Sequence, residues 1–566
     1  MSNIDWIVLI LTLLVIVVYG IYKSRNVNSI DGYILSDRSL PWYTVGLSVM
    51  ATQASAITFL SAPGLAYTSG MSFVQFYFGL PLAMIVLCVT FIPIFHRLKV
   101  YTAYEFLEHR FDVKTRILTA ILFLIQRGIS TGITIFAPAI ILSSILQINL
   151  TITTLGIGAL VIGYTVYGGT KAVSYTQLLQ MSIIFAGLLL AGILVIHLLP
   201  EHIGFKEALH IAGKSGKANA IDFKFDLNNQ YTVWTGLIGG FFLQLSYFGT
   251  DQSQVGRYLT GASIKESRLG LLMNGLLKVP MQFCILLIGI LVFAYYQYHT
   301  PPLFFNEKET IKLENSIYKD DYKQIISKHE QLSQDKVQVI NELTEALNEK
   351  DEKAIEGIKQ QLSTFDQQDR LLRDDLIQLI KKNDADADTN DNNYIFLKFV
   401  KDTFPKGLIG LLIAIIFLAS MGATASAINS LSSTSIIDIY KRFIKKDASD
   451  AFYLKASRYC TFFWGVFTVI IALYANKLGN LLEAVNILGS LFYGTILGIF
   501  LVAFYIKRIQ GKAVFIAALI SECIIIIIWK LDIVAFLWLN LIGCVLVMII
   551  GYIIQEILNS RKSVEA

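Results

Sequence analysis

The chain has 566 residues, of which 54% are hydrophobic and only 16% are charged, and its mean hydropathy is +0.58. Soluble proteins of this length are far less apolar, so the composition excludes a soluble protein and indicates a polytopic membrane protein surrounded by a lipid bilayer. The formal net charge of +5 arises mostly from Lys and Arg in the loops between apolar segments, so it gives no reason to expect a nucleic-acid partner.

Apolar windows long enough to cross a bilayer, which takes about 20 residues each, recur along the whole chain. The first has no basic region before it and no small-residue cleavage site after it, so we expect a retained membrane span rather than a signal peptide. About thirteen transmembrane helices are predicted, near residues 4–22, 42–66, 72–98, 117–147, 152–168, 175–199, 233–250, 269–298, 406–431, 457–476, 481–505, 513–529 and 532–555.

Clusters of basic residues follow the first, third, seventh, ninth, eleventh and thirteenth windows. Because Lys and Arg accumulate in cytoplasmic loops, we predict a multi-pass protein of the cell membrane, inner or plasma, with its N-terminus outside and its C-terminus in the cytoplasm. The five cysteines lie in apolar windows without paired spacing, which predicts neither a disulfide nor a metal site.

The second window lies within the stretch from Ser39 to Gly70, which is rich in small and hydroxylic residues. This run stops at Pro63 and Gly64, which is the pattern of a discontinuous helix that lines a cavity in the middle of the membrane. Backbone carbonyl groups freed by such a break could coordinate an ion. A tight interface between helices with small residues is the alternative explanation of the same pattern.

Residues 299–404 contain no membrane-spanning window, and the predicted topology places them outside the cell. Apolar residues recur at helical spacing from Tyr322 to Leu347 and again from Ile355 to Leu379, which predicts an extramembrane helical hairpin. The polar run after it, 381–393, lacks the glycine and the terminal glutamate of a calcium-binding EF-hand loop, so it is predicted to be a linker. The hairpin could bind an extracytoplasmic protein partner or merely cap the membrane part.

The ninth window and its exit, from Ala414 to Arg442, are the most informative part of the chain. Unsatisfied polar groups in hydrocarbon cost several kcal/mol, so its polar side chains are expected to face protein, water or a transported solute. The small and polar residues crowded there are Gly422, Thr424, Ser426, Asn429, Ser432, Ser433 and Thr434.

Six segments stand out along the chain: SLPWYTVGLSVMATQASAITFLSAPG, YEFLEHRFD (Tyr104 to Asp112), YGGTKAVSYTQLLQ (Tyr167 to Gln180), GTDQSQVGRYL (Gly249 to Leu259), LLKVP (Leu276 to Pro280) and SAINSLSSTSIIDIYK. Together they resemble the sodium:solute symporter family, which includes sodium-coupled sugar, proline, monocarboxylate, iodide and sialic acid transporters. The resemblance covers about residues 30–510 but not the insertion at 299–404, and the combination is more specific than any single motif.

The resemblance implies an all-α, LeuT-type core of two inverted repeats of five helices each, in which sites form where the first helix of each repeat is broken. The expected units are 1–38 (first transmembrane helix and cytoplasmic link), 39–199 (inverted repeat 1), 200–232 (extracytoplasmic loop), 233–298 (start of inverted repeat 2), 299–404 (extracytoplasmic helical insertion), 405–505 (rest of inverted repeat 2) and 506–566 (C-terminal helices and cytoplasmic tail).

The resemblance also implies a sodium site. Its ligands would be the backbone carbonyls of Ala51, Ala54 and Ala419 together with two side-chain hydroxyls that the family carries as a Ser-Ser or Ser-Thr pair. This chain has Gly422 and Ala423 at those two positions. No other metal or cofactor is expected.

A second departure falls in the same neighbourhood. Many family members carry an acid in the YGG helix that supports a sodium site, and this chain has Gln177 there. A hard monovalent cation needs a cage of oxygens, so we predict that sodium coupling is weakened or absent. The alternative is a shifted cage that uses Thr424 or Ser426, or an oxygen supplied by the solute.

Polar groups expected near the cavity are the candidates for solute binding. Lys278 and Arg127 are buried cations in predicted spans, and such residues tend to line a transport pathway. Because both are cationic, an anionic or highly hydroxylated solute is favoured, and Arg127 could hold a carboxylate in a bidentate manner. A structural role for Lys278, bonded to carbonyls near Pro280, is the alternative. The candidates are Gln53, Thr58, Gln75, Tyr77, Arg127, Gln244, Tyr247, Lys278 and Asn486.

We therefore predict a secondary active transporter that moves a small polar or anionic organic solute by alternating access, a solute of the sugar, sugar acid, carboxylate or amino acid type. An enzyme is not indicated, because no nucleophile–base set, metal cluster or phosphate-binding loop occurs. Two alternatives remain open: a sodium-independent carrier, or a receptor that senses a solute and signals through residues 299–404.

Overall fold

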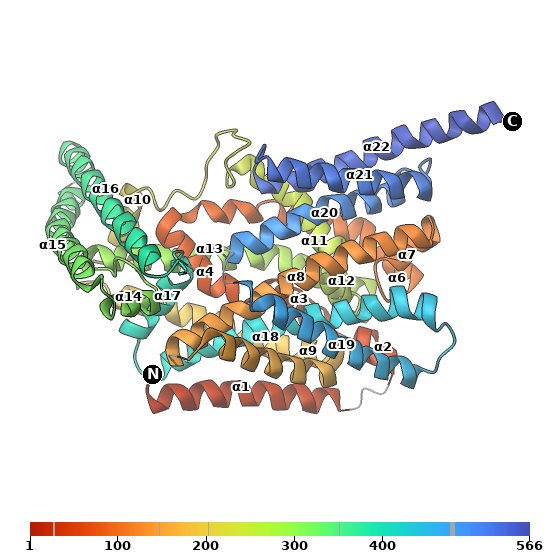
Figure 1. Cartoon of the computed structure of the whole chain (residues 1–566), viewed down its shortest axis with the longest axis horizontal. Coiled ribbons are helices and arrows are strands. Elements are labelled where there is room, and N and C mark those ends of the chain that lie inside the picture. The colour runs from red at the N-terminus through yellow and green to blue at the C-terminus, as the bar shows by residue number, and fades with distance from the viewer. Residues whose placement is uncertain are drawn as a thin grey trace.

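The computed structural model describes residues 1–25, 29–146, 148–201, 203–349, 351–385, 387–475 and 481–565. Within these ranges the regular structure is helical, and the one β-bridge joins Leu40 to Gly261. Most helices run along the long axis of the molecule and form the membrane core, while a hairpin of two long helices projects from one end (Figure 1). The predicted all-α architecture is thus confirmed, together with its helical insertion.

The membrane core contains most of the helices, several of them interrupted by short 3₁₀ or π-helical segments. Its helices are α1 (Asn3–Ser24), α2 (Ile30–Leu35), α3 (Trp42–Gln53), α4 (Ala56–Ser69), α5 (Leu80–Val86), α6 (Ile92–Leu98), α7 (Glu105–Arg110), α8 (Val113–Leu146), α9 (Leu150–His197), α10 (Phe205–Lys214), α11 (Gly240–Thr250), α12 (Gln252–Tyr258), α13 (Ile264–Tyr298), α18 (Leu408–Thr434), α19 (Asp450–Ala472), α20 (Leu481–Tyr505), α21 (Gly511–Lys530) and α22 (Phe536–Glu565).

Nine helical stretches of the described chain are long and apolar enough to cross a bilayer, and the bent pair α3 and α4 makes a tenth. The remaining predicted spans are also helical: residues 150–163 form the first part of α9, residues 235–250 include α11, and α19 covers the third. The two spans predicted at 152–168 and 175–199 are merged into α9, which is broken at Gly169, where φ is +55°. Only glycine adopts this backbone conformation without strain, so the glycine in the sequence explains why α9 can break at this position.

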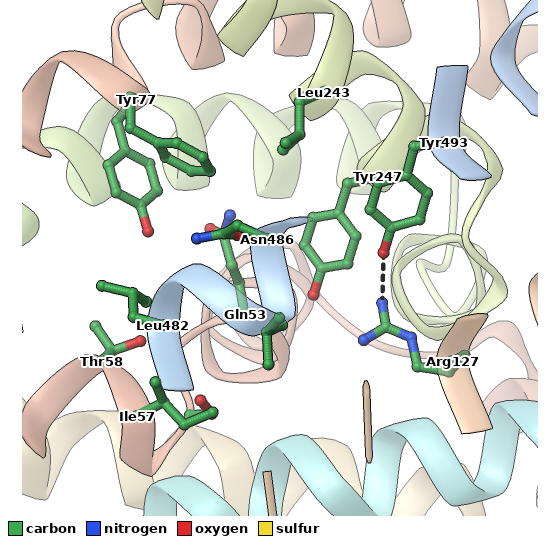
Figure 2. Close-up of a pocket in the computed structure, with 13 residues that line it drawn as sticks. Gln53, Ile57, Thr58, Tyr77, Arg127, Leu243, Tyr247, Leu482, Asn486 and Tyr493 are labelled. Atoms are coloured by element: carbon green, nitrogen blue, oxygen red, sulfur yellow. Dashed lines mark hydrogen bonds between the residues drawn. The ribbon is translucent and has the colours of Figure 1, made fainter. Parts of the chain in front are cut away.

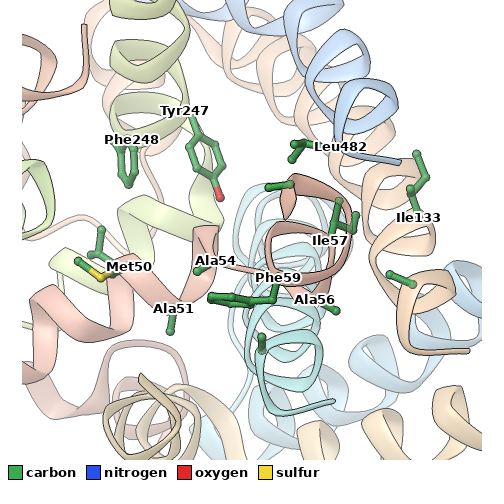
Figure 3. Close-up of a cluster of buried hydrophobic side chains, with 14 of the residues drawn as sticks. Met50, Ala51, Ala54, Ala56, Ile57, Phe59, Ile133, Tyr247, Phe248 and Leu482 are labelled. Atoms are coloured by element: carbon green, nitrogen blue, oxygen red, sulfur yellow. The ribbon is translucent and has the colours of Figure 1, made fainter. Parts of the chain in front are cut away.

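Two further breaks lie in the middle of the core. Helices α3 and α4 meet at an angle of 59°, because the Ser55 N–H donates to the carbonyl of Gln53 and no longer to that of Ala51. Helices α11 and α12 are separated by Asp251, whose backbone is extended. Apolar side chains on both sides of the first break, among them Met50 and Phe59, pack into the core and hold the two halves in place (Figure 3). The second window is broken as predicted, but the predicted position was wrong: Pro63 and Gly64 lie inside α4, and the break lies eight residues before Pro63.

Small residues let these helices approach closely. A Cβ at Gly64 of α4 would lie 2.0 Å from the backbone oxygen of Asn392, and a Cβ at Gly289 of α13 would lie 2.2 Å from that of Pro63. Helix α1 is attached in another way: Asp5 accepts hydrogen bonds from the backbone N–H groups of Gly407 and Gly410 at the start of α18. Acceptors at a helix N-terminus satisfy N–H groups that have no partner within the helix.

The insertion comprises α14 (Glu307–Glu314), α15 (Lys319–Glu349), α16 (Glu352–Asn383) and α17 (Asn392–Thr403). Helices α15 and α16 form an antiparallel hairpin whose apolar seam includes Ile340, Leu343 and Leu376. The N-terminus lies at the same end of the molecule as this hairpin and the C-terminus at the opposite end, as the parity of the predicted spans requires (Figure 1).

Candidate functional site

A cavity of about 80 Å³ lies beside the break between α3 and α4 (Figure 2). Its wall is built from both halves of the broken helix, from the 3₁₀ segment at 71–77, and from α8, α11 and α20. Polar and aromatic groups from distant parts of the chain therefore converge on one small space. The lining residues are Gln53, Ser55, Ile57, Thr58, Phe76, Tyr77, Arg127, Leu243, Tyr247, Leu482, Val485, Asn486 and Tyr493.

A charged network forms one side of this cavity. The guanidinium of Arg127 is paired with Asp251, with Nε 3.0 Å from Oδ2, and the Tyr493 hydroxyl donates to the same carboxylate oxygen at 2.8 Å. The Asp251 side chain is fully buried, and that of Arg127 is 11% exposed. The ring of Tyr247 lies 5.2 Å from the guanidinium carbon of Arg127. The Nη1 group of Arg127 stays outside these bonds, so a solute carboxylate would share the guanidinium with Asp251.

Six of the nine predicted solute-binding residues line the cavity, and three do not. Gln244 lies behind the wall and accepts a hydrogen bond from Gln53 at 3.2 Å. Gln75 is buried, and its amide donates to the carbonyl of Tyr231 at 2.8 Å, which is a structural arrangement. The six that line it are Gln53, Thr58, Tyr77, Arg127, Tyr247 and Asn486.

Lys278 lies in α13, completely buried and outside the cavity wall. Its amine is 5.7 Å from the centre of the Tyr77 ring, and it has no hydrogen-bond partner in the part of the chain that the structure describes. Because Tyr77 itself lines the cavity, Lys278 could act on a bound solute only through this ring.

Sequence reasoning missed Asp251 and Tyr493 as members of the site. Asp251 stands in the polar stretch GTDQSQ, where an acid at a helix break was a usable signal. Tyr493 lies in the apolar helix α20, and nothing in its neighbourhood distinguishes it from a packing residue. The apolar lining residues, such as Leu243 and Leu482, carry no sequence signal either.

The residues of the predicted sodium site are all buried and lie where α3, α9 and α18 meet. The Gln177 carboxamide stands among them and forms three hydrogen bonds. Its nitrogen donates to the Gly422 carbonyl at 3.0 Å and to the Thr52 hydroxyl at 3.1 Å, and its oxygen accepts from the Ser48 hydroxyl at 2.6 Å. An N–H donor thus binds two oxygen atoms beside the implied ligands, the carbonyls of Ala51, Ala54 and Ala419, but it does not bind those carbonyls themselves. Ser426 contacts the same network through Thr52, at 3.1 Å.

A second glutamine fills the space beside Gly422. A Cβ added at Gly422 would lie 2.5 Å from Oε1 of Gln180, so a serine there would require this amide to move. Neither polar atom of the Gln180 side chain has a hydrogen-bond partner among the described residues, although the residue is 1% exposed. At Gly422 the space of the missing side chain is therefore filled by glutamine side chains.

Comparisons with known proteins identify the family of this chain. The sodium:solute symporter family matches residues 33–308 and 375–521. The human sodium/iodide cotransporter is 32% identical over 271 residues, which are 47% of this chain and 41% of that protein. The sodium/sialic acid symporter NanT of Aliivibrio fischeri is 24% identical over 558 residues, 98% of this chain and 93% of that protein.

The comparison of structures gives the same fold. A Na⁺-coupled sialic acid symporter, solved in a substrate-bound outward-open state, superimposes with a TM-score of 0.75 and 22% identity over 98% of both chains. This likeness confirms the predicted LeuT-type architecture. The alignment with the human iodide cotransporter spans less than half of that protein's length, so activity and substrate do not follow from it.

Proposed function

We propose that this chain, which belongs to the sodium:solute symporter family, is a secondary transporter of a small anionic or polar organic solute that works by alternating access. The observation that carries the proposal is the cavity at the α3–α4 break, where Arg127 faces Gln53, Thr58 and Asn486. Broken helices hold substrates near the middle of the membrane in transporters of this architecture. Iodide and sialic acid, named for the two relatives above, are both anions.

The cavity sets a limit on the size of the solute in this conformation. A space of about 80 Å³ accommodates a small carboxylate more readily than a sugar. A larger solute would require the ring of Tyr77 or of Tyr247 to swing out of the cavity.

We further propose that sodium coupling is weaker in this protein than in its family. Three carbonyl groups remain for a cation, at Ala51, Ala54 and Ala419, whereas the two hydroxyl positions are Gly422 and Ala423. The Gln177 amide supports this view, because its N–H groups bind acceptor atoms of the same neighbourhood. A carboxylate at that position would instead add negative charge.

Thermal unfolding of the purified protein across a sodium titration tests sodium coupling, with choline holding the ionic strength constant. A ligand that binds only the folded state stabilises it by mass action, by about 2.7 kcal/mol at 100 times its Kd. We expect no sodium-specific stabilisation of the parent and clear stabilisation of the triple variant Q177D/G422S/A423T. Because Gln180 would contact the new serine, the same triple variant with Q180A is the second arm. Sodium-specific stabilisation of the parent would contradict the proposal.

Transport itself is tested in proteoliposomes with labelled pyruvate, labelled sialic acid and a neutral sugar. Saturable uptake that R127Q and N486A reduce supports the carrier. Saturable binding without any flux would favour a receptor that senses a solute and signals through residues 299–404. Flux that never exceeds the external concentration would indicate a sodium-independent, passive carrier.

The same proposal includes the orientation of the chain in the membrane. We infer that the N-terminus and the insertion face the outside of the cell and that the C-terminus is cytoplasmic, because Lys and Arg cluster in the loops at the C-terminal end. Labelling of single cysteines placed at exposed Lys353 and Lys512 of intact cells with a membrane-impermeant reagent checks this. Only the first position should react.

A further inference from the structure

A second and larger cavity lies between the insertion and the membrane core. We call it the interface cavity; it measures about 240 Å³, against about 80 Å³ for the cavity at the helix break. Its walls come from the end of α4, the end of α13 with the linker after it, and the facing sides of α15 and α16. No role in the proposed transport cycle accounts for a space of this size at this position.

Basic side chains outnumber acidic ones on its wall. Lys217, Lys336, Arg370 and Arg373 face two aspartates, and both aspartates already have a partner. The Lys336 amine is 2.8 Å from Asp366, and the His329 ring is 2.8 Å from Asp369. Arg373 is itself engaged, by a third carboxylate and by the carbonyl of Leu303.

Two cations of the wall, Lys217 and Arg370, form no ion pair among the described residues. The Lys217 amine donates to the Thr68 carbonyl and stands 5.6 Å from the centre of the Phe293 ring. Burial holds the pKa of Lys217 below its ordinary value. The negative charge of Asp366 raises this pKa, and the positive charges of Arg370 and Lys336 lower it further. Arg370 has no hydrogen-bond or ion-pair partner within the described ranges. An anion between these two side chains would stabilise both charges.

The floor of the interface cavity is aromatic. The Tyr67 ring packs edge-to-face against Phe293, with centroids 5.7 Å apart, and against Phe305 at 5.6 Å. Tyr296 and Phe365 complete this apolar wall. Aromatic walls with a few convergent charged groups are characteristic of small-molecule sites.

We propose that the interface cavity is a binding site for a small organic anion, whose charged group lies between Lys217 and Arg370 and whose apolar body packs on Tyr67 and Phe293. The ligand would contact the insertion and α4 at the same time. Since α4 is one half of the broken helix, a bound anion would hold the insertion against the element that lines the central cavity.

The hairpin side of the interface cavity lies outside the family match. The family match stops at residue 308 and resumes at residue 375, so the α15 and α16 residues that line the cavity, including Arg370, lie outside it. The core side of the cavity, with Tyr67 and Phe293, falls inside the matched range. The proposal is therefore independent of the proposed transport activity.

Isothermal titration calorimetry of the purified full-length protein with benzoate tests the proposal. We expect saturable binding of benzoate and none of benzyl alcohol, which has the same ring without the charge. R370Q should weaken benzoate binding by about tenfold, the value of one charge-assisted hydrogen bond. Arg370 is exposed and unpaired among the described residues, so this variant should fold normally.

K323Q is the matched control, because Lys323 is an exposed cation of α15 that does not line the cavity. It should bind benzoate as the parent does. Equal losses in R370Q and K323Q, or equal affinities for benzoate and chloride, would overturn the proposal. So would loss of binding in N486A with none in R370Q, since the anion would then occupy the central cavity. Failure of solute uptake in proteoliposomes would not change the conclusion about the interface cavity, because calorimetry measures benzoate binding directly.

Discussion

The membrane core and the hairpin of α15 and α16 differ in how far their ion pairs are buried. In the core, Arg127 and Asp251 meet deep inside, with the aspartate fully buried. In the hairpin, the side chains of the pair Lys336 and Asp366 are 20% and 46% exposed. An exposed pair contributes little because water screens it, whereas a buried charge without its partner is costly. A pair of a basic and an acidic residue therefore has different consequences in the two regions.

The two regions also pack differently. The core brings backbones together at glycines, as where Gly289 of α13 meets Pro63 of α4. The hairpin instead joins two amphipathic helices along a seam of larger residues, and Gly357 of α16 faces open space. Substitutions should accordingly be felt far more in the core.

The largest effect is expected when the buried pair is broken. R127A leaves the Asp251 carboxylate buried without its cation and should lower the free energy of unfolding by about 3–5 kcal/mol. K336A, which removes the cation of the exposed pair, should cost less than about 1 kcal/mol. Thermal unfolding of both variants in detergent measures the difference. Equal losses would mean that the comparison of the two regions is wrong.

A second contrast uses alanine at two glycines. G64A places a Cβ against the Asn392 backbone and should destabilise the protein by about 1–3 kcal/mol. G357A meets no atom within 4 Å and should stabilise α16 by up to about 1 kcal/mol, because alanine favours the helix. Denaturation midpoints of the two variants give the sign of each change in stability. If the two changes have the same sign, the contrast between the two regions is wrong.

Lys278 tests what a buried charged group costs when it has no hydrogen-bond partner. Its amine is buried without a hydrogen-bond partner in the described structure, so K278M should stabilise the protein by about 1–3 kcal/mol. The exposed control K382M should change stability by less than about 0.5 kcal/mol. If K278M is stable but loses solute uptake, the lysine serves transport; if uptake persists, its role lies elsewhere.

The smallest expected effect is a pH dependence of the stability of the insertion. Burial opposes a charged His329, but its contacts with Asp369 and with the Pro301 carbonyl, and the charge of Glu330, raise the pKa of His329 above its usual 6.5. The stabilisation of the insertion by charged His329 is therefore fully present below pH 6.5, and it is lost as the pH rises through the raised pKa of His329. Hydrogen exchange of α15 and α16 should show H329Q less protected than the parent at pH 6.

The difference between H329Q and the parent should vanish at a pH above the raised pKa of His329. The hydrogen bonds explain why: both ring nitrogens face oxygen atoms, at 2.8 Å each, and only the doubly protonated ring can donate to both. A difference in protection that is the same at pH 6 and pH 9 would indicate a purely structural role for the ring.

Much of the fold could be predicted from the sequence. Long apolar windows gave the membrane helices, and the period of apolar residues between Tyr322 and Leu379 gave the hairpin, because both patterns reflect which side of a helix meets an apolar surface. A break in the second window was predicted from its small residues, but at Pro63 and Gly64, whereas the chain bends at Ala54 and Ser55. Six of nine solute-binding candidates line the cavity.

The other three candidates show where sequence reasoning ends. Gln75 and Gln244 lie on elements that line the cavity, and Lys278 lies on α13, which does not; none of the three side chains lines the space beside Gln53 and Tyr77. A sequence tells which helix carries a polar residue. It does not tell which way that helix is rotated against its neighbours, since rotation is decided by packing.

The sequence by itself determined the membrane class, the all-α architecture, the family motifs and the two lost hydroxyls at Gly422 and Ala423, because each is a matter of residue type and local period. Only the tertiary structure decided that Gln177 and Gln180 lie against Gly422, and that Asp251 neutralises Arg127. It alone also placed the interface cavity between α4, α13 and the insertion. Contacts between residues far apart in the chain depend on how helices pack, and no local pattern records them.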